Sequence, residues 1–418
     1  MPETLWIYLD CDWADVPVLV GRLFRETLRG APKYSFEFEQ SWLEKYAGVR
    51  LSADLENYAG RQFLTTGSEI FGCFSDAMPD RWGRVLLERR EQMSAEKEGR
   101  SPRTLTAFDM LCGLDDGLRL GGLRFKRDPS GAFLNEGTLF SVPPITSLDE
   151  LAEAAAKIEE SETRGALPEE KWLLQLVEPG SSLGGARPKA SVRDDDGSLW
   201  VAKFPSRNDR YDVGAWEQFA YLLARKAGIE TAPSQLIMLG QNRHAFLVKR
   251  FDRKDGARVH FASALTLTGL QDGDGSSSGH GYLDIVELML ENCTDLERNL
   301  EALYRRVAFN ICIGNTDDHF RNHGFLLTRK GWTLSPAYDM NPTTGRRQSL
   351  LVNNDTDVSD LKLLRASASL YFLGPRRADA IIGEVLSAVR DWQKVADQLA
   401  LLQRERALFA GRFITDLS

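Results

Sequence analysis

Cysteine is scarce in this sequence, and long apolar runs are missing. Only five of the 418 residues are cysteine, and they are scattered without a Cys-x-x-Cys pair. This usage is typical of reduced thiols and argues against a disulfide framework or a cysteine zinc site. No apolar run approaches the length that crosses a bilayer, and the first residues lack the basic and apolar regions of a signal peptide. These absences predict a cytoplasmic protein with no membrane segment.

An excess of positive charge is also missing. The formal net charge is −8, whereas a general nucleic-acid surface is normally basic. Apolar residues make up 43% of the chain and charged residues 27%, as is ordinary for a globular protein. The length allows two or three domains with ample core material. We therefore expect a globular protein of several domains without a general nucleic-acid surface.

The first part of the chain, residues 1–130, is predicted to be rich in strands. Alternating or apolar runs predict strands at Leu5–Leu9, Val18–Leu23 and Tyr34–Phe38. A helix is expected over Trp82–Met93, after an Asp/Pro-containing start, and the glycine-punctuated segment 113–125 predicts a hairpin. No catalytic constellation is evident here, so the favoured interpretation is a docking or lid domain.

A glycine-bearing loop comes after a predicted helix in residues 145–250. The helix begins at Ser147, which has capping-box spacing to Glu150. The loop contains Ser182, Gly184 and Gly185, but it is not a Walker A motif, because Ala follows Gly185 where that motif needs Lys. Many such loops are simple turns. Its value as a nucleotide-binding signal therefore depends on the residues that come after the loop.

One lysine stands inside an apolar strand pattern after this loop. The run Leu199–Phe204 predicts a strand that contains Lys203, and such a lysine can be an edge-strand residue that points to water. The alternative is the kinase lysine that contacts ATP phosphates, because Val-Ala-Lys resembles the strand that carries it. The glycine loop precedes Lys203 by about one hairpin, which is the order expected in a nucleotide-binding lobe.

Two further features bear on the kinase alternative. Glu217 stands near the start of a predicted helix, and an active kinase pairs its strand lysine with a helix glutamate. Glu217 could equally be a first-turn acid that favours the helix terminus, and both interpretations remain open. Farther on, Ala245–Arg253 predicts a buried strand with a charged exit. In a two-lobed kinase this is the place of the hinge, where backbone groups of Arg250 and Phe251 would meet the adenine ring.

The remaining residues, 251–418, are predicted to be mainly helical. Apolar residues recur at three- and four-residue steps, as in helices that pack against a core. The pattern predicts helices at Leu283–Glu291, Leu296–Ile313, Arg377–Val389 and Trp392–Phe413.

Between these helices lies the segment most typical of catalysis, Asn315–Gly324. It holds two carboxylates, two imidazoles and two carboxamides, and polar loops between buried elements are where scaffolds position catalytic groups. Asp317 and Asn322 have the spacing of the kinase Asp-x-x-x-x-Asn pair, in which the Asp accepts the hydroxyl proton and the Asn holds Mg²⁺. Asp339, expected at the end of a short strand, suits a second metal-holding carboxylate.

Two histidines in the same segment raise a metalloenzyme alternative. His319 and His323 stand four residues apart, a spacing that could bind zinc on a helix. The Glu of His-Glu-x-x-His is absent and no third ligand stands out, so this alternative is disfavoured. His319 is interpreted as a brace of the catalytic loop through hydrogen bonds, or as a packed histidine.

Five ordered motifs together resemble the HipA family. They are Ser182–Lys189, Ala202–Pro205, Val248–Arg253, Asn315–Asn322 and Ala337–Asp339, and the N-terminal segments Met78–Gly83 and Leu120–Phe125 match as well. The resemblance covers nearly the whole chain, and five motifs in order are far more specific than any one. HipA proteins are bacterial serine/threonine protein kinases that act as toxins of type II toxin–antitoxin systems.

The resemblance implies an α+β fold that is two-lobed and protein-kinase-like (HipA-like). Its parts would be a strand-rich N-terminal subdomain (1–130), a nucleotide-binding N-lobe (145–250) and a mainly helical C-lobe with the catalytic loop (251–418). The implied cofactors are ATP and magnesium (Mg2+). The glycine loop with Gly184 and Gly185 would lie in the nucleotide site.

The resemblance also implies roles for single residues. Lys203 would contact ATP, Asp317 would be the catalytic base, and Asn322 and Asp339 would hold Mg²⁺. Ser182 would be an autophosphorylation site that silences the enzyme. Met-Asn follows Asp339 where the kinase motif has Phe-Gly, which puts switching by the usual Phe in doubt.

The partners implied by the resemblance are macromolecules. One is a small HipB-like helix-turn-helix antitoxin, and since no helix-turn-helix is evident in this chain, DNA contact is expected only indirectly through it. The protein substrate would belong to translation, for example an aminoacyl-tRNA synthetase. Two alternatives remain: a small-molecule or lipid kinase with the same phosphate machinery, and a catalytically silent antitoxin-binding co-repressor. The intact Lys203, Asp317, Asn322 and Asp339 disfavour the silent protein.

Overall fold

The structure is a computed structural model that describes residues 3–65, 67–136, 142–177, 185, 187–240 and 243–417. Contacts group the chain into two compact units. The first unit holds Met1–Asp209 and Ile237–Ala262, and the second holds Arg210–Leu236 and Ser263–Ser418. Each unit thus combines segments that are distant in the sequence. The division into three predicted domains stays a prediction.

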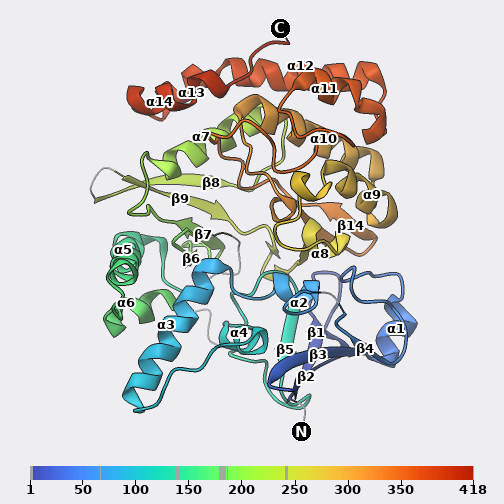
Figure 1. The fold of residues 1–418 in the computed structure, drawn as a ribbon, viewed down its shortest axis with the longest axis vertical. Helices are drawn as coiled ribbons and strands as arrows, with labels where there is room; N and C mark the ends of the chain where they lie inside the picture. Colours follow the sequence, from blue (N-terminus) through green and yellow to red (C-terminus); the bar gives the residue numbers. More distant parts are fainter. Residues whose placement is uncertain are drawn as a thin grey trace. The chain divides into compact units, whose positions relative to one another are not determined.

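The N-terminal part of the first unit is an antiparallel sheet of order β4-β3-β2-β1-β5 (Figure 1). Its strands are β1 (Glu3–Leu9), β2 (Val18–Leu28), β3 (Ala31–Phe38), β4 (Arg61–Phe63) and β5 (Leu123–Lys126). The first three confirm the predicted strands. The hairpin predicted over 113–125 is wrong, because β5 pairs with β1. Residues 114–122 instead form a loop, several of whose carbonyls accept hydrogen bonds from arginine side chains.

Some helices of the first unit begin with a side-chain cap and others do not. They are α1 (Gln40–Tyr46), α2 (Gly72–Asp76), α3 (Arg81–Lys97), α4 (Ala107–Gly113), α5 (Leu148–Arg164) and α6 (Glu170–Val177). The start of α3 is set by Asp80, whose Oδ1 accepts from the Gly83 N–H at 2.7 Å. The capping box predicted at Ser147 is wrong: this residue ends a 3-10 turn that continues into α5, and its side chain makes no cap bond.

A second sheet, of order β6-β7-β9-β8, lies in the first unit except for residues 234–236 at the start of β8. Its strands are β6 (Lys189–Arg193), β7 (Leu199–Lys203), β8 (Ser234–Leu239) and β9 (Arg243–Lys249), and the short strands β10 (Arg253–Lys254) and β11 (Ala257–Arg258) come next. Side chains from α3, α5 and α6 share one hydrophobic core with this sheet, including Leu86, Ile158, Leu176, Val192 and Leu247. The sheet therefore has one face covered by helices.

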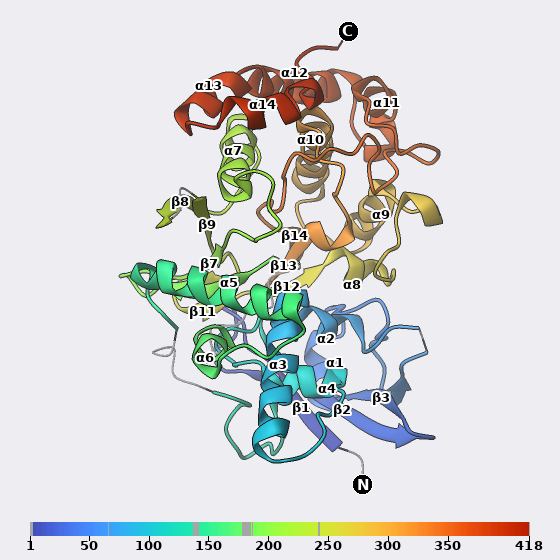
Figure 2. The same ribbon diagram turned by 60° about the vertical axis from the view of Figure 1, so that its left-hand side comes forward.

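The second unit is mainly helical, as predicted. Its helices are α7 (Val213–Lys226), α8 (Ala264–Thr268), α9 (Tyr282–Asn292), α10 (Leu296–Ile313), α11 (Leu361–Ala366), α12 (Pro375–Arg390), α13 (Trp392–Gln398) and α14 (Gln403–Phe409). In both views α12 and α13 (red) lie beside α7, and α12 also packs on α10 (Figures 1 and 2). The strands β13 (Gly324–Thr328) and β14 (Gly331–Leu334) form an antiparallel hairpin, and β12 (His260–Ser263) crosses the boundary between the units. Within the described part of the chain, no helix combines the length and apolar character that a membrane span requires.

The single helix predicted over Trp392–Phe413 is wrong. The chain leaves α13 at Ala400, which has a left-handed φ of 50°. The Leu401 N–H then bonds the Ala396 carbonyl at 3.0 Å, as in helix ends closed by a left-handed residue. Leu401 is only 5% exposed, so burying it stabilises the break.

Candidate functional site

The predicted catalytic segment comes directly after α10. Gly314 ends the helix with φ of 69°, a left-handed conformation that glycine adopts readily. A Cβ here would come within 2.8 Å of the Arg412 Cβ, so space favours glycine as well. The Asn315 N–H donates to the Asn310 carbonyl at 2.9 Å, and this bond turns the chain into the catalytic loop, residues 315–323.

Asp318 is the buried centre of the catalytic loop. It is 3% exposed, and its Oδ2 accepts hydrogen bonds from Tyr282 Oη at 2.7 Å, Asn310 Nδ2 at 2.7 Å and His323 Nε2 at 2.8 Å. These donors come from α9, from α10 and from the residue before β13. One oxygen therefore ties three separate segments together. No role is predicted for Asp318 from the sequence; the signal that could have found it is the Asp-Asp doublet followed by His323.

The Asp318 centre carries negative charge. Burial by itself would raise the pKa of the Asp318 carboxyl, but the nearby His323 and the hydrogen bonds from His323 and Tyr282 bring it below its usual value. Burial, followed by the charge of Asp318, raises the pKa of Tyr282 well above its usual range, so Tyr282 remains a donor. An ionised buried carboxylate holds its donors firmly, because losing one leaves charge without compensation.

Asp317 lies next to this centre and is exposed. Its N–H donates to Asn315 Oδ1 at 3.2 Å, and its carbonyl accepts from Asn322 Nδ2 at 3.2 Å. The structure therefore brings the predicted Asp317–Asn322 pair together, with the main chain of Asp317 anchored on both sides. Because Nδ2 of Asn322 is used in this bond, its Oδ1 is the atom suited to a cation.

His319 and His323 do not lie on one α-helix. They flank a 3-10 turn at Phe320–Asn322, so the helical spacing that supported the zinc alternative is absent. His323 supplies the bond to Asp318, whereas the buried Nδ1 of His319 has no hydrogen-bond partner among the described residues. The bracing role of His319 stays a prediction.

Asp339 lies beyond the open end of the β13–β14 hairpin. The sequence predicted Asp339 at the end of a short strand, and this is wrong. Asp339 instead lies two residues past an isolated bridge between Ala337 and Thr231. Its φ of 53° is left-handed, a conformation that aspartate adopts more readily than most residues.

A tyrosine connects the segments of Asp339 and Asn322. Tyr338 Oη donates to the Arg321 carbonyl at 2.7 Å. Tyr338 precedes Asp339 in the chain, and Arg321 precedes Asn322. This bond therefore brings the two predicted metal-holding residues to the same end of the hairpin.

Asn322 and Asp339 fit magnesium in their chemistry. One offers an amide oxygen and the other a carboxylate, and Mg²⁺ in kinases takes such ligands together with phosphate and water oxygens. Within the residues that the structure describes, no group of three or more His, Cys, Asp or Glu side chains is arranged as a metal site. The pair therefore suits a cation that is shared with a phosphate ligand, and the assignment stays a prediction.

Glu217 belongs to the same unit and is 1% exposed. It lies past the first turn of α7, which holds no acidic residue, so the interpretation as a first-turn acid is wrong. Burial raises the pKa of Tyr221 well above its usual range, and the charges of Glu217 and Asp339 raise it further. Tyr221 is thus near both carboxylates. The pairing of Glu217 with Lys203 stays a prediction.

Lys203 is the last residue of β7 in the first unit. Because β7 lies between β6 and β9, the edge-strand interpretation is wrong. Lys189 of β6 and Phe246 of β9 stand opposite Lys203 in the sheet register, and Lys203 Nζ lies 5.9 Å from the centre of the Phe246 ring. Direct opposition places Lys189 and Lys203 on the same face of the sheet.

Lys189 is a site residue that sequence reasoning misses. It is 1% exposed, and its Nζ pairs with Asp80 Oδ2 at 2.8 Å and donates to the Gly185 carbonyl at 3.0 Å. Asp80 thus caps α3 and offsets the charge of Lys189, which holds the end of the glycine loop. Gly185 has φ of 88°, where glycine is favoured. Ser182 and Gly184 lie outside the described residues.

The predicted hinge comes after β9. The Arg250 guanidinium is buried and bonds Asp252 and the carbonyls of Leu118 and Arg119. The Arg250 N–H donates to the Leu199 carbonyl at 2.9 Å. These bonds occupy the side chain and the amide, so a nucleotide contact by Arg250 would use its carbonyl. The ring of Phe251 packs on that of Phe261, with ring centres 6.1 Å apart. This contact does not test the prediction that the backbone of Phe251 meets the adenine ring.

Comparison with known proteins defines the class. The model of the HipA-like C-terminal domain matches residues 181–393, and that of the HipA N-terminal domain matches residues 16–109. Because the first match alone spans half of the chain, this chain belongs to the HipA family.

Particular relatives agree with this class. Putative kinase Y4mE of Sinorhizobium fredii (strain NBRC 101917 / NGR234) is 26% identical over 332 residues, which are 73% of this chain and 71% of that protein. HipA of Shewanella oneidensis MR-1, solved in a complex with HipB and its operator DNA, aligns with 98% of this chain and 94% of its own at 19% identity and a TM-score of 0.66. This likeness confirms the predicted α+β fold of HipA type. The Helicobacter pylori proinflammatory kinase CtkA aligns with 53% of this chain and 91% of its own at 14% identity and a TM-score of 0.39, which is too low to show a common fold.

Proposed function

We propose that this chain is an ATP- and Mg²⁺-dependent serine/threonine protein kinase of HipA type. The observation that supports it most is the exposed Asp317 beside the buried, triply bonded Asp318. The catalytic loop is held firmly at the point where the Asp317 carboxylate reaches solvent. Phosphoryl transfer asks for such positioning more than for covalent chemistry by the protein.

In the proposed reaction Asp317 accepts the proton of a substrate hydroxyl. The hydroxyl oxygen bonds to the γ-phosphorus of ATP, the bond from that phosphorus to the bridging oxygen breaks, and ADP leaves. Mg²⁺ held by Asn322 and Asp339 would neutralise phosphate charge. The base needs only an ionised carboxylate within reach of the hydroxyl, and the exposure of Asp317 is consistent with that need.

The first unit would supply the nucleotide contacts. Lys203 is proposed to contact the phosphates, with Gly184 and Gly185 in the loop over the nucleotide. Glu217, which belongs to the second unit, is proposed to orient Lys203. Two observations support this: Lys203 is on a central strand of the sheet, and Lys189 holds the Gly185 carbonyl beside it. The backbone of the hinge residues would meet the adenine ring.

The proposed partner is a HipB-like helix-turn-helix antitoxin. The similar HipA of Shewanella oneidensis MR-1 is solved with HipB and its operator DNA, which supports an antitoxin partner. Contact of this chain with DNA is proposed to be only indirect, through that partner. The proposed role is that of the toxin of the pair, located in the cytoplasm. Its proposed protein substrate belongs to translation, such as an aminoacyl-tRNA synthetase, and phosphorylation of Ser182 would silence it.

The test compares transfer by the wild type, Asp317→Asn and Glu297→Gln, with Mg²⁺ and γ-labelled ATP. Glu297 is an exposed acid in the first turn of α10, and the helix separates it from the catalytic loop by about 27 Å along its axis. We expect label on Ser182 in the wild type and in Glu297→Gln. In Asp317→Asn transfer should fall at least about 100-fold, as for loss of a general base, while calorimetry still detects ATP binding. Equal labelling of Asp317→Asn and wild type would overturn the proposal.

A further inference from the structure

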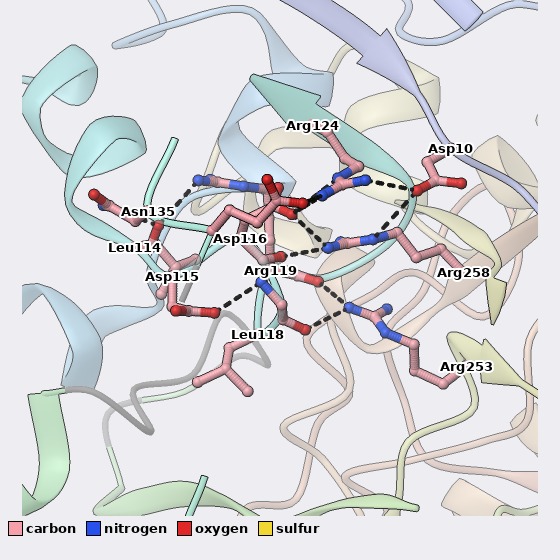
Figure 3. A network of polar contacts seen from close by, with 12 residues as sticks. Asp10, Leu114, Asp115, Asp116, Leu118, Arg119, Arg124, Asn135, Arg253 and Arg258 are labelled. Atoms are coloured by element: carbon pink, nitrogen blue, oxygen red, sulfur yellow. Dashed lines mark hydrogen bonds and ion pairs between the residues drawn. The ribbon is translucent and has the colours of Figure 1, made fainter. Parts of the chain in front are cut away.

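Arginines of the first unit converge on the loop of residues 114–122. Figure 3 shows Asp116 and Arg119, which belong to this loop, and Asp10, Arg124, Arg253 and Arg258 around it. Three arginines that come after β9 donate hydrogen bonds to main-chain carbonyls of this loop. Arg250 donates to Leu118 at 2.7 Å and to Arg119 at 3.0 Å. Arg253 donates to Gly117 and to Arg119, both at 2.9 Å, and Arg258 donates to Asp116 at 2.6 Å. The segment after β9 thus holds the main chain of a loop more than 130 residues earlier.

Asp252 joins the same two segments. It is fully buried, and its carboxylate accepts from Arg250 Nε at 2.8 Å, Arg253 Nη1 at 2.7 Å and the Gly121 N–H at 2.8 Å. Burial alone would raise the pKa of Asp252, but the charges of Arg250 and Arg253 hold it well below its usual range. The carboxylate therefore stays ionised and fully bonded.

The glycines of the loop show how closely its backbone approaches the rest of the unit. A Cβ at Gly121, where φ is 75°, would lie 2.9 Å from the Phe261 amide nitrogen. A Cβ at Gly122 would lie 2.4 Å from the Asp10 carbonyl oxygen. Neither backbone contact can give way easily. Two independent features, the arginine bonds and the glycine contacts, thus specify one position of the loop.

We propose that this network positions the adenine-binding hinge, so that the N-terminal subdomain is a working part of the nucleotide site. The network is termed the hinge brace and consists of residues 114–122 with Arg250, Asp252, Arg253 and Arg258. The proposal rests on the kinase function proposed above. Arg250 and Asp252 stand on either side of Phe251, and both side chains are held by the loop. Backbone recognition of a flat base needs its partners placed within about 0.5 Å, and the brace supplies that placement.

The test measures nucleotide binding by Arg253→Lys, with Arg258→Lys as a milder second variant. Lysine keeps the charge opposite Asp252 but loses the fork that reaches the Gly117 and Arg119 carbonyls. On phosphatase-treated protein with Mg²⁺, we expect the Kd for ATP to rise about tenfold, or about 1.4 kcal/mol. The preference for ATP over GTP should fall, because a displaced hinge discriminates less between bases. Arg258→Lys should also raise the Kd for ATP and lower the preference for ATP over GTP, but by smaller amounts.

Glu91→Gln is the matched control in the same unit. Glu91, on α3, accepts from Arg100 and Arg103 and has no hydrogen bond to the hinge brace among the described residues. The Glu91→Gln variant should lower the unfolding midpoint without changing the Kd for ATP or the preference for ATP over GTP. If both brace variants lower the midpoint as Glu91→Gln does and leave nucleotide binding unchanged, the network is structural only and the inference is wrong. A wild type that binds no ATP would instead refute the proposed function and the brace with it.

Discussion

Replacing Asp318 by asparagine should destabilise the second unit by about 3 kcal/mol although the two side chains have nearly the same shape. All three hydrogen bonds of Asp318 end on one oxygen, Oδ2. Bonds to a charged acceptor contribute about 1 kcal/mol more than bonds to a neutral one, and three are affected. Alanine would leave three buried donors unsatisfied at about 1–3 kcal/mol each, which is comparable with the whole stability of many domains, about 5–15 kcal/mol.

Hydrogen exchange of peptides from α9 and α10 is the suitable assay, because these helices carry Tyr282 and Asn310. A loss of about 3 kcal/mol should speed their slowest exchange about 100-fold. The folded pKa of Asp318 is lowered, so its stabilisation is present above the unfolded value, about pH 4. It is lost as the pH falls further, toward the folded pKa. The difference between variant and wild type should therefore shrink in acid.

Asp360→Asn is the control with the same chemical change. Asp360 caps α11 by accepting from the Lys362 N–H at 2.6 Å, and asparagine caps helices as well as aspartate does. It should change exchange by less than about threefold, since its free-energy effect is a few tenths of a kcal/mol. If Asp318→Asn exchanges like Asp360→Asn, the central role of Asp318 in holding the loop is refuted.

Two further predictions concern other buried groups. Glu405 accepts hydrogen bonds from Trp216 Nε1 at 3.1 Å and from the Asp212 N–H at 3.4 Å, at the start of α7. Glu405→Ala should lower the free energy of unfolding, measured in urea, by about 2 kcal/mol. Glu405→Gln keeps an acceptor and should lower it clearly less. An equal loss in both variants would show that the hydrogen bonds are not the cause. Burial lowers the pKa of His260 to about 3 in the folded protein, whereas the unfolded value is near 6.5. Between these two pH values the unfolded chain binds a proton that the folded protein does not, so the free energy of unfolding decreases as the pH is lowered. At pH 5 the loss should be about 2 kcal/mol relative to pH 7. His260→Gln should remove that part of the slope in urea midpoints measured from pH 7 to pH 5, and an unchanged slope would contradict it.

Local patterns were sufficient for much of the second unit. The helix predicted over Leu296–Ile313 has the same bounds as α10, because its apolar spacing and the glycine that comes after it are both signals within one segment. The Asp317–Asn322 pair was predicted from spacing alone, and the structure joins the two residues within one loop. The failures were also local signals. Ser147 ends a 3-10 turn and makes no cap bond, and the helix after Trp392 breaks at Ala400, where burial of Leu401 stabilises the break.

The sequence by itself determined many of the strands and helices, the order of the motifs and the HipA class, since each depends on residues close together or on their order. Only the tertiary structure decided which groups hold the site. Tyr282 reaches Asp318 across 36 residues, Lys189 reaches Asp80 across 109, and Arg250 reaches the Leu118 carbonyl across 132. Such pairs leave no periodic trace, because a buried charge takes any partner that the fold brings within hydrogen-bond distance. The residues named from sequence are those proposed to meet the substrates, and the residues that hold them in place had to be found in the fold.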